Sequence, residues 1–280
     1  MTHFSKTKKL LLGLGAVSGV AVLYYCNGQN RRVHASWTSN YVPSPHAKWD
    51  ENWDHRSPKY IRSSRSRSSE KDENELNEDR EKLTPKVCRH LLLIRHGQYN
   101  LDGKTDAERV LTKLGRIQAD YTGKRLQELS LPYTKMIRST MARADETGAI
   151  ISQYLPSIPI THCDLLREGA PVPPEPPLGS YKPEAYKFFT DGARIEAAFR
   201  KYFHRADPDE TKDSYIVIVC HANVIRYLVC RALQFPAEAW LRMSLNHASI
   251  TWISITPSGR CVLRTFGDTG HMPPDVITST

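Results

Sequence analysis

Residues 89–95 read RHLLLIR, a short apolar run that ends directly before His96 and Gly97. A second run of this kind, residues 215–220, reads YIVIVC and ends directly before His221. Continuous apolar runs of this length are typical of strands in a sheet that is covered on both faces. Both runs are therefore predicted to be inner strands, each with a histidine at its carboxyl end.

Helices and further strands are predicted around these two runs. Helices are expected at residues 112–129, 141–154, 183–203 and 224–233. Further strands are expected at residues 135–138, 249–255 and 261–266, the last two as a hairpin at the edge. Strands that alternate with helices indicate an α/β domain, with a mostly parallel central sheet and helices on both faces.

Two histidines stand where such a sheet places its ligand site, because ligands bind outside the carboxyl ends of the strands. The imidazole of His96 can act as a nucleophile toward phosphorus, and its neutral form is available near neutral pH. Arg95 carries a guanidinium that can bind two phosphoryl oxygens at once. Gly97 lets the backbone approach a phosphate closely. His221 is expected to be a second donor, as the imidazolium, so the sequence predicts phosphoryl transfer.

The order of these motifs resembles the phosphoglycerate mutase branch of the histidine phosphatase superfamily, whose signature is an R-H-G near the start of the domain. The resemblance extends over roughly residues 89–270. The matching segments are residues 95–97, 111–119, 138–147, 166–169 and 220–223.

The resemblance assigns a role to five residues. It implies that His96 becomes phosphorylated and that Arg95, Arg143 and His221 bind the phosphoryl oxygens. It implies that Glu168 is the general acid for the leaving alcohol and then the base for water. This route needs no metal or other cofactor, and no Cys/His spacing in the chain is that of a zinc site.

One departure from the family pattern concerns the substrate. Many members read R-H-G-E, whereas Gln98 and Tyr99 follow Gly97 here. The change removes a carboxylate beside the expected phosphate pocket. It argues against a phosphoglycerate or sugar-phosphate arrangement, but not against phosphohistidine chemistry.

A candidate membrane segment precedes the domain. After the basic residues 1–9, residues 10–26 read LLLGLGAVSGVAVLYYC without a charge. At about 1.5 Å per residue, this helix just reaches the lower end of the length needed to span a bilayer. A cleaved secretory signal is the alternative, because residues 33–35 resemble a cleavage site. Basic residues on both flanks favour a transmembrane anchor and leave its orientation open.

Residues 27–85 are polar and are predicted to be a linker to a catalytic domain at residues 86–280. Residues 62–69, rich in Arg and Ser, indicate solvated linker, with a phosphorylated regulatory segment as the alternative. Two tryptophans in this linker are costly to leave in water, so they are predicted to dock on a partner, or alternatively on their own domain. The motif that contains them comprises Trp49, Asp50, Asn52, Trp53 and Asp54.

This layout is similar to that of the mitochondrial serine/threonine protein phosphatases of the same family, which combine a membrane segment, a W-D-x-N-W-D element and a phosphatase domain. The similarity implies phosphoserine and phosphothreonine proteins as substrates and a single-pass location in a mitochondrial membrane. It also implies a homo-oligomer assembled through residues 49–54.

The composition and the core residues bear on other function classes. The net charge is +9, but the basic residues are scattered, which argues against nucleic-acid binding. None of the six cysteines forms a C-x-x-C pair, which fits free thiols in a reducing compartment. A phosphoglycerate mutase or small-molecule phosphatase shares the same core residues and remains an alternative. A membrane scaffold with an inert domain is a second alternative, which the intact set of candidate catalytic residues disfavours.

Overall fold

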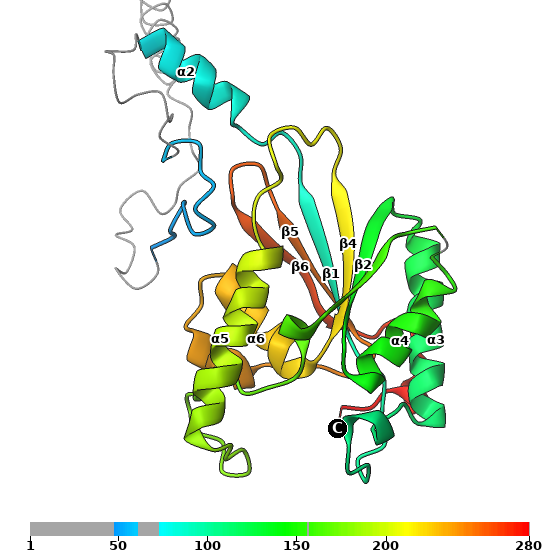
Figure 1. The fold of residues 1–280 in the computed structure, drawn as a ribbon. Helices are drawn as coiled ribbons and strands as arrows, with labels where there is room; N and C mark the ends of the chain where they lie inside the picture. The colour runs from blue at the N-terminus through cyan, green and yellow to red at the C-terminus, as the bar shows by residue number, and fades with distance from the viewer. Residues whose placement is uncertain (1–47, 61–72, 156, 280) are drawn as a thin grey trace, which may run out of the picture. The chain divides into compact units, whose positions relative to one another are not determined.

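The structure is a computed structural model that describes residues 48–60, 73–155 and 157–279 (Figure 1). Trp49–Thr280 forms one compact unit. The predicted membrane segment, residues 10–26, and the Arg/Ser-rich segment, residues 62–69, lie outside the described residues. Within the described ranges, no helix is both long enough and apolar enough to cross a membrane.

The domain is built on a single six-stranded sheet in the order β3-β2-β4-β1-β5-β6. The pairs β1–β4, β2–β4 and β2–β3 are parallel, whereas β1–β5 and β5–β6 are antiparallel. The strands are β1 (Arg89–Arg95), β2 (Tyr133–Ser139), β3 (Ile160–Cys163), β4 (Ser214–Cys220), β5 (Ile250–Ile255) and β6 (Cys261–Asp268).

The prediction of a mostly parallel sheet was wrong, because the sheet is mixed. Only the few residues 256–260 connect β5 to β6, and so short a link joins antiparallel neighbours, whereas a parallel crossover needs about a dozen residues or more. β5 then pairs with β1 in the antiparallel direction. The short strand β3 was not predicted either.

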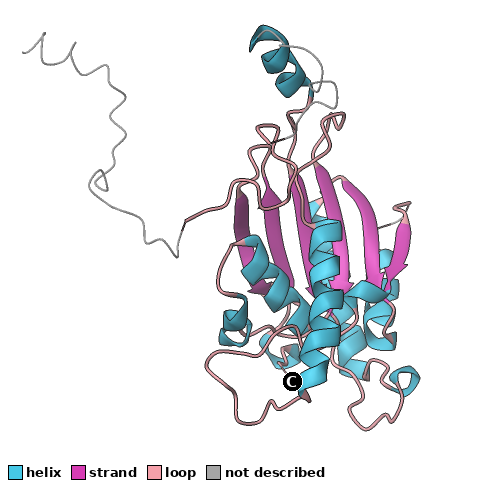
Figure 2. Cartoon of the chain, turned by 60° about the vertical axis from the view of Figure 1, so that its left-hand side comes forward, coloured by secondary structure: helices cyan, strands magenta, loops and turns pink. Residues whose placement is uncertain are grey.

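Helices cover both faces of the sheet, as expected (Figures 1 and 2). A further helix, α2 (Glu73–Lys82), lies in the segment predicted to be linker. Helices α3 (Lys113–Leu129) and α4 (Ala142–Ser152) pack on one face, and α5 (Ala185–Tyr202) and α6 (Ala222–Ala232) on the other. The short 3₁₀ helices are η2 (Asp106–Glu108), η3 (Asp164–Leu166), η4 (Ala237–Arg242) and η5 (Pro274–Val276).

The apolar run of β1 supplies both cores. Successive side chains of a strand point to opposite faces of the sheet. Leu91 and Leu93 therefore pack in the core beneath α5 and α6, whereas Leu92 and Ile94 pack in the core beneath α3 and α4. All four side chains are fully buried, which explains why this strand is apolar at every inner position.

The parallel pairing of β1 and β4 positions the site. In their register Arg95 lies opposite Cys220, so the next residues, His96 and His221, leave the sheet side by side. The loops that follow the parallel strands gather at this same end of the domain (Figure 1).

Residues 49–57 pack on the catalytic domain in this single chain, which is the second of the two arrangements considered above. The Trp53 indole Nε1 donates a hydrogen bond of 2.8 Å to the carbonyl of Gly259. Its ring lies 5.6 Å from that of Phe199 on α5. The carboxylate of Asp54 forms an ion pair with Arg205, and both side chains are buried.

Candidate active site

His96 is a buried histidine whose ring is held in one protonation state by its neighbours. Its Nδ1 lies 2.8 Å from the carbonyl oxygen of Gly97. A carbonyl only accepts hydrogen bonds, so Nδ1 carries the proton. The other nitrogen, Nε2, accepts a hydrogen bond of 3.2 Å from Nε of Arg143. The lone pair that a nucleophile needs is therefore on Nε2.

His221 caps the start of α6 next to His96, with the two ring centroids 5.1 Å apart. Its Nε2 lies 2.8 Å from the hydroxyl of Ser139, the last residue of β2. Its buried Nδ1 has no hydrogen-bond partner among the described residues. If the Ser139 hydroxyl donates to Nε2, then Nδ1 carries the proton and remains available to an incoming oxygen.

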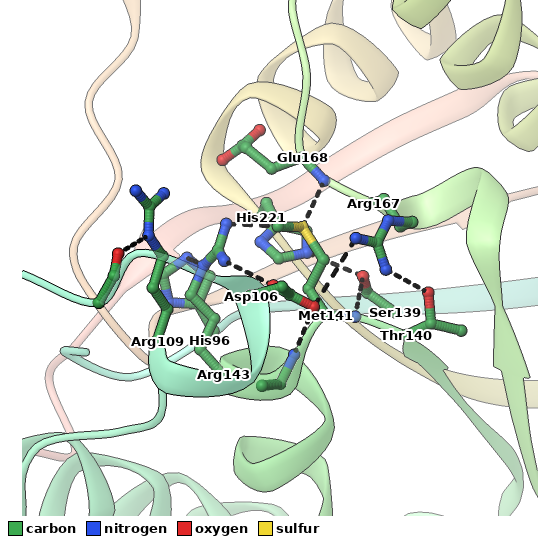
Figure 3. Close-up of polar contacts among 12 residues, drawn as sticks. His96, Asp106, Arg109, Ser139, Thr140, Met141, Arg143, Arg167, Glu168 and His221 are labelled. Carbon is green, nitrogen blue, oxygen red and sulfur yellow. Dashed lines mark hydrogen bonds and ion pairs between the residues drawn. The ribbon is translucent and has the colours of Figure 1, made fainter. Parts of the chain in front are cut away.

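Arg143, the second residue of α4, lies beside His96 and Asp106 (Figure 3). Besides the bond to His96, its guanidinium stacks over the ring of Tyr99, 4.6 Å from the centroid. The Tyr99 ring also meets His96 edge-on at 5.1 Å. Within the described residues, Nη1 of Arg143 makes no hydrogen bond, so this buried donor is free to bind an oxygen.

Arg95 is held more tightly than the sequence indicated. Its Nη1 donates to the carbonyl oxygens of Leu245 and Ser279, and its Nη2 lies 3.1 Å from Nε2 of His247. Burial lowers the pKa of Arg95 to about 10, which still leaves it charged at neutral pH. In the part of the chain that the structure describes, its Nε has no partner. The terminal residues of the chain thus help to orient this arginine.

Glu168 follows η3 and completes the group. One carboxylate oxygen of Glu168 and one ring nitrogen each of His96 and His221 lie within 4.8 Å of one another. Burial raises the pKa of Glu168, although the charges of Arg143 and Arg95 oppose this rise. A raised pKa retains the proton closer to neutrality, as a general acid requires.

Residues 91–171 and 182–269 match the family model of the histidine phosphatase superfamily (branch 1). This chain belongs to the histidine phosphatase superfamily. The membership confirms the resemblance drawn from the motifs, and it includes the segments that carry His96, Arg143, Glu168 and His221.

Two relatives are similar to this protein along nearly its whole length. The mitochondrial serine/threonine-protein phosphatase Pgam5 of Drosophila pseudoobscura pseudoobscura is 52% identical over 95% of this chain and 93% of its own length. The protein of the same name from Drosophila yakuba is 49% identical over 98% of this chain and 96% of its own length. Among solved structures, Bacillus stearothermophilus YhfR has a similar fold, with a TM-score of 0.51, 24% identity, and coverage of 65% of this chain and 98% of its own.

The structure brings together the five residues that the family resemblance assigned in this histidine phosphatase: His96, Glu168 and His221 form one group, Arg143 bonds His96, and the charge of Arg95 acts on both His96 and Glu168. The sequence predicted an imidazolium at His221, whereas the burial of this ring in the structure favours its neutral form. Burial holds the pKa of His221 well below its usual value, and the nearby charge of Arg143 adds to this effect. Burial, His221 and Arg143 lower the pKa of His96 in the same way, so both rings are neutral at neutral pH.

The charge around the pocket favours an anion over a cation. His96, Glu168 and His221 have the residue types of a metal site. However, the guanidinium groups of Arg95 and Arg143 act electrostatically on both His96 and Glu168. Positive charge of this density repels a cation and attracts a phosphoryl group, so the set fits a phosphate better than a metal.

Sequence reasoning missed several residues that hold this site together. Asp106 reaches the pocket from η2, with Oδ1 lying 3.6 Å from Nη1 of Arg143 and Oδ2 lying 3.7 Å from Nη2 of Arg167 (Figure 3). Ser139 orients His221. Ser139 lies in the segment 138–147 that matches the family, but nothing in the sequence indicated a role for it. No local pattern marks Asp106, because the loop that carries it reaches the site only through the tertiary fold.

Proposed function

We propose that this protein hydrolyses phosphoserine and phosphothreonine in proteins through a phosphohistidine on His96. The protonation of the His96 ring is the observation that carries this proposal. Nδ1 donates to the carbonyl of Gly97, so the unprotonated nitrogen is Nε2, whose lone pair faces Nε of Arg143. Such a ring is prepared for attack on phosphorus without first losing a proton.

The first step transfers the phosphoryl group to the enzyme. Nε2 of His96 forms a bond to phosphorus while the bond from phosphorus to the side-chain oxygen of the substrate breaks. The charge on the phosphoryl oxygens is stabilised by Arg95, Arg143 and His221. Glu168 donates its proton to the leaving serine or threonine oxygen, and the raised pKa of Glu168 supports this role.

The second step releases phosphate. Glu168, now ionised, accepts a proton from a water molecule, whose oxygen attacks phosphorus as the bond from phosphorus to Nε2 of His96 breaks. Inorganic phosphate leaves, and both His96 and Glu168 return to their starting states. The closeness of Glu168 to the two histidines supports one carboxyl serving both steps.

The nature of the substrate is supported by the relatives rather than by the pocket alone. Two proteins that are about half identical along nearly the whole chain are called serine/threonine-protein phosphatases, and both are called mitochondrial. We therefore propose a mitochondrial location. We also propose that residues 10–26 anchor the chain as a single-pass membrane helix.

Assembly into a homo-oligomer through Trp49, Asp50, Asn52, Trp53 and Asp54 is a further part of the proposal. The contacts of Trp53 and Asp54 support it, because they define a specific docking site on the domain. In the proposed homo-oligomer, the same segment of another subunit would occupy this site. A double variant, Trp49→Ala with Trp53→Ala, should run as a smaller species in gel filtration and lose activity. Full activity in that smaller species would contradict this part of the proposal.

The decisive experiment compares phosphate release by the full-length protein in detergent from phosphoserine peptides, phosphothreonine peptides and phosphoglycerate. The expected result is release from the peptides by the wild type and none by His96→Ala. Brief incubation with a ³²P-labelled phosphopeptide should also leave an acid-labile label on the wild type. Turnover of phosphoglycerate far above that of the peptides would identify a small-molecule phosphatase or mutase instead. A folded protein inert on every substrate would favour the scaffold hypothesis.

A further inference from the structure

Helix α5 lies in unusually close contact with the segment that carries Glu168. A side chain added at Gly169 would place its Cβ 2.5 Å from Cγ of Asp191 and 2.6 Å from Nη2 of Arg194. A Cβ added at Gly192 on α5 would lie 2.4 Å from the carbonyl oxygen of Pro171. Real Cβ atoms essentially never approach other atoms so closely. Two glycines therefore allow the backbone of this segment to lie directly against α5.

Arg194 binds backbone carbonyl groups at the candidate acid and before it. Its Nη1 donates to the carbonyl oxygens of Leu165 and Arg167, at 3.1 and 2.5 Å. Its Nη2 donates to the carbonyl oxygen of Glu168 itself, at 3.1 Å. The planar guanidinium has five donors in a rigid arrangement, so these bonds restrict the path of the backbone in more than one direction.

Asp191 binds both Arg194 and the backbone that follows Glu168. Its Oδ1 accepts a hydrogen bond of 2.9 Å from Nη2 of Arg194, and its Oδ2 accepts one of 3.1 Å from the amide of Ala170. The pair thus binds carbonyl groups up to Glu168 and an amide two residues later. Both side chains are largely buried, with exposures of 22% and 26%, which strengthens such bonds.

The carboxyl of Glu168 has little else to hold it. Its Oε1 accepts one long hydrogen bond, 3.3 Å, from the amide of Gly169. Within the described ranges no ion pair to this carboxylate is shorter than 4.0 Å. The position of the side chain therefore follows from the position of its backbone.

We propose that Arg194 and Asp191 are positioning residues for Glu168, which hold its carboxyl where it can protonate the leaving group. The inference rests on the proposed function, because it takes Glu168 to be the general acid. Neither Arg194 nor Asp191 needs to touch the substrate for this role.

Loss of the positioning role can be distinguished from a general loss of stability by its dependence on the leaving group of the substrate. An alkyl alcohol such as serine is a poor leaving group and depends on a proton from Glu168, whereas p-nitrophenolate leaves with little such help. The ratio kcat/KM reports steps up to departure of the leaving group. A displaced Glu168 should therefore lower kcat/KM for a phosphoserine peptide much more than for p-nitrophenyl phosphate.

The experiment measures kcat/KM with both substrates for the full-length protein in detergent and for Arg194→Ala. We expect Arg194→Ala to lower kcat/KM about 10²-fold on the phosphoserine peptide and less than about tenfold on p-nitrophenyl phosphate, since general acid help is worth roughly 10²–10⁴. Arg200→Ala is the matched control, because Arg200 lies on the same helix with 77% exposure and, among the residues that the structure describes, pairs only with Glu196. It should leave both values unchanged.

Further variants keep the test decisive. Asp191→Asn preserves the shape of the side chain, so it should show the same preference for the aryl substrate even if Arg194→Ala does not fold. An equal loss on both substrates, or no loss, in a folded variant would overturn the proposal. Glu168→Gln serves as the reference. If Glu168→Gln lost kcat/KM equally on both substrates, the general-acid role of Glu168 would itself be refuted. If only Arg194→Ala did so, the positioning role of Arg194 would be refuted and the general-acid role would stand.

Discussion

Oδ1 of Asp106 lies 3.6 Å from Nη1 of Arg143, and neither of these buried atoms has a hydrogen-bond partner within the described part of the chain. The two atoms are too far apart for a hydrogen bond but close enough to attract. A phosphoryl oxygen bound to Nη1 of Arg143 would meet the negative charge of Asp106. The aspartate therefore offsets the charge of the arginine and opposes the binding of phosphate, the product.

Removing this carboxylate should strengthen product inhibition. We expect Asp106→Asn to lower the inhibition constant for inorganic phosphate by about fivefold, since a partly exposed charge at this distance contributes on the order of 1 kcal/mol. The measurement is inhibition of p-nitrophenyl phosphate hydrolysis by added phosphate. Asp102→Asn, an exposed change in the same loop, is the control and should have no effect. An unchanged or larger inhibition constant in Asp106→Asn would contradict the prediction.

The hydroxyl of Ser139 should matter for catalysis because it forms a hydrogen bond with Nε2 of His221. In Ser139→Ala, Nε2 of His221 loses this partner, so the ring is held less firmly in one orientation. We expect kcat/KM to fall about tenfold, because the loss of one hydrogen bond of this kind costs on the order of 1 kcal/mol or more. Ser152→Ala, at an exposed helix end, is the control. Steady-state kinetics with a phosphoserine peptide provide the test, and an unaltered kcat/KM would refute it.

The pH dependence should differ between leaving groups. The pKa of Glu168 is raised by burial, and its protonated form is the one that donates. Activity on a phosphoserine peptide should therefore be present below this raised pKa and decline as the pH rises through it. His96 is already neutral well below its usual pKa, so its protonation should add no acid limb near pH 6.5.

The comparison substrate for this profile is p-nitrophenyl phosphate, whose own ionisation changes in a similar way. The kcat/KM for the phosphoserine peptide, divided by that for p-nitrophenyl phosphate, should fall with rising pH in the wild type. The same ratio should stay level in Glu168→Gln. A level ratio in the wild type would show that Glu168 is not the acid.

The buried ion pair between Asp54 and Arg205 should stabilise the domain. Removing one partner leaves the other charge buried and unpaired, which typically costs about 3–5 kcal/mol. We therefore expect Arg205→Ala to lower the free energy of unfolding by about 3 kcal/mol in urea. Arg56→Ala removes an exposed ion pair with Asp207 and should change this free energy by less than about 1 kcal/mol. Similar effects of the two changes would contradict the prediction.

Much of the fold followed from local patterns in the sequence. The apolar runs of β1 and β4 and the periodic helices α3 to α6 could be predicted, because burial on both faces or on one face leaves a pattern along a few neighbouring residues. β3 could not be predicted, because its four residues alternate too little and three of them remain exposed. The mixed character of the sheet depended on which edge of β1 the hairpin would join, a choice between distant segments.

The sequence by itself predicted the candidate reacting groups. His96 and His221 each directly follow a predicted strand, and the resemblance to the family implied the roles of Arg95, Arg143 and Glu168. Only the tertiary structure decided their protonation and their support. The neutral rings follow from burial, and the contacts of Asp106, Ser139, Asp191 and Arg194 join segments far apart in the chain. Burial and long-range contacts depend on how the whole chain packs, and no short stretch of sequence records that packing.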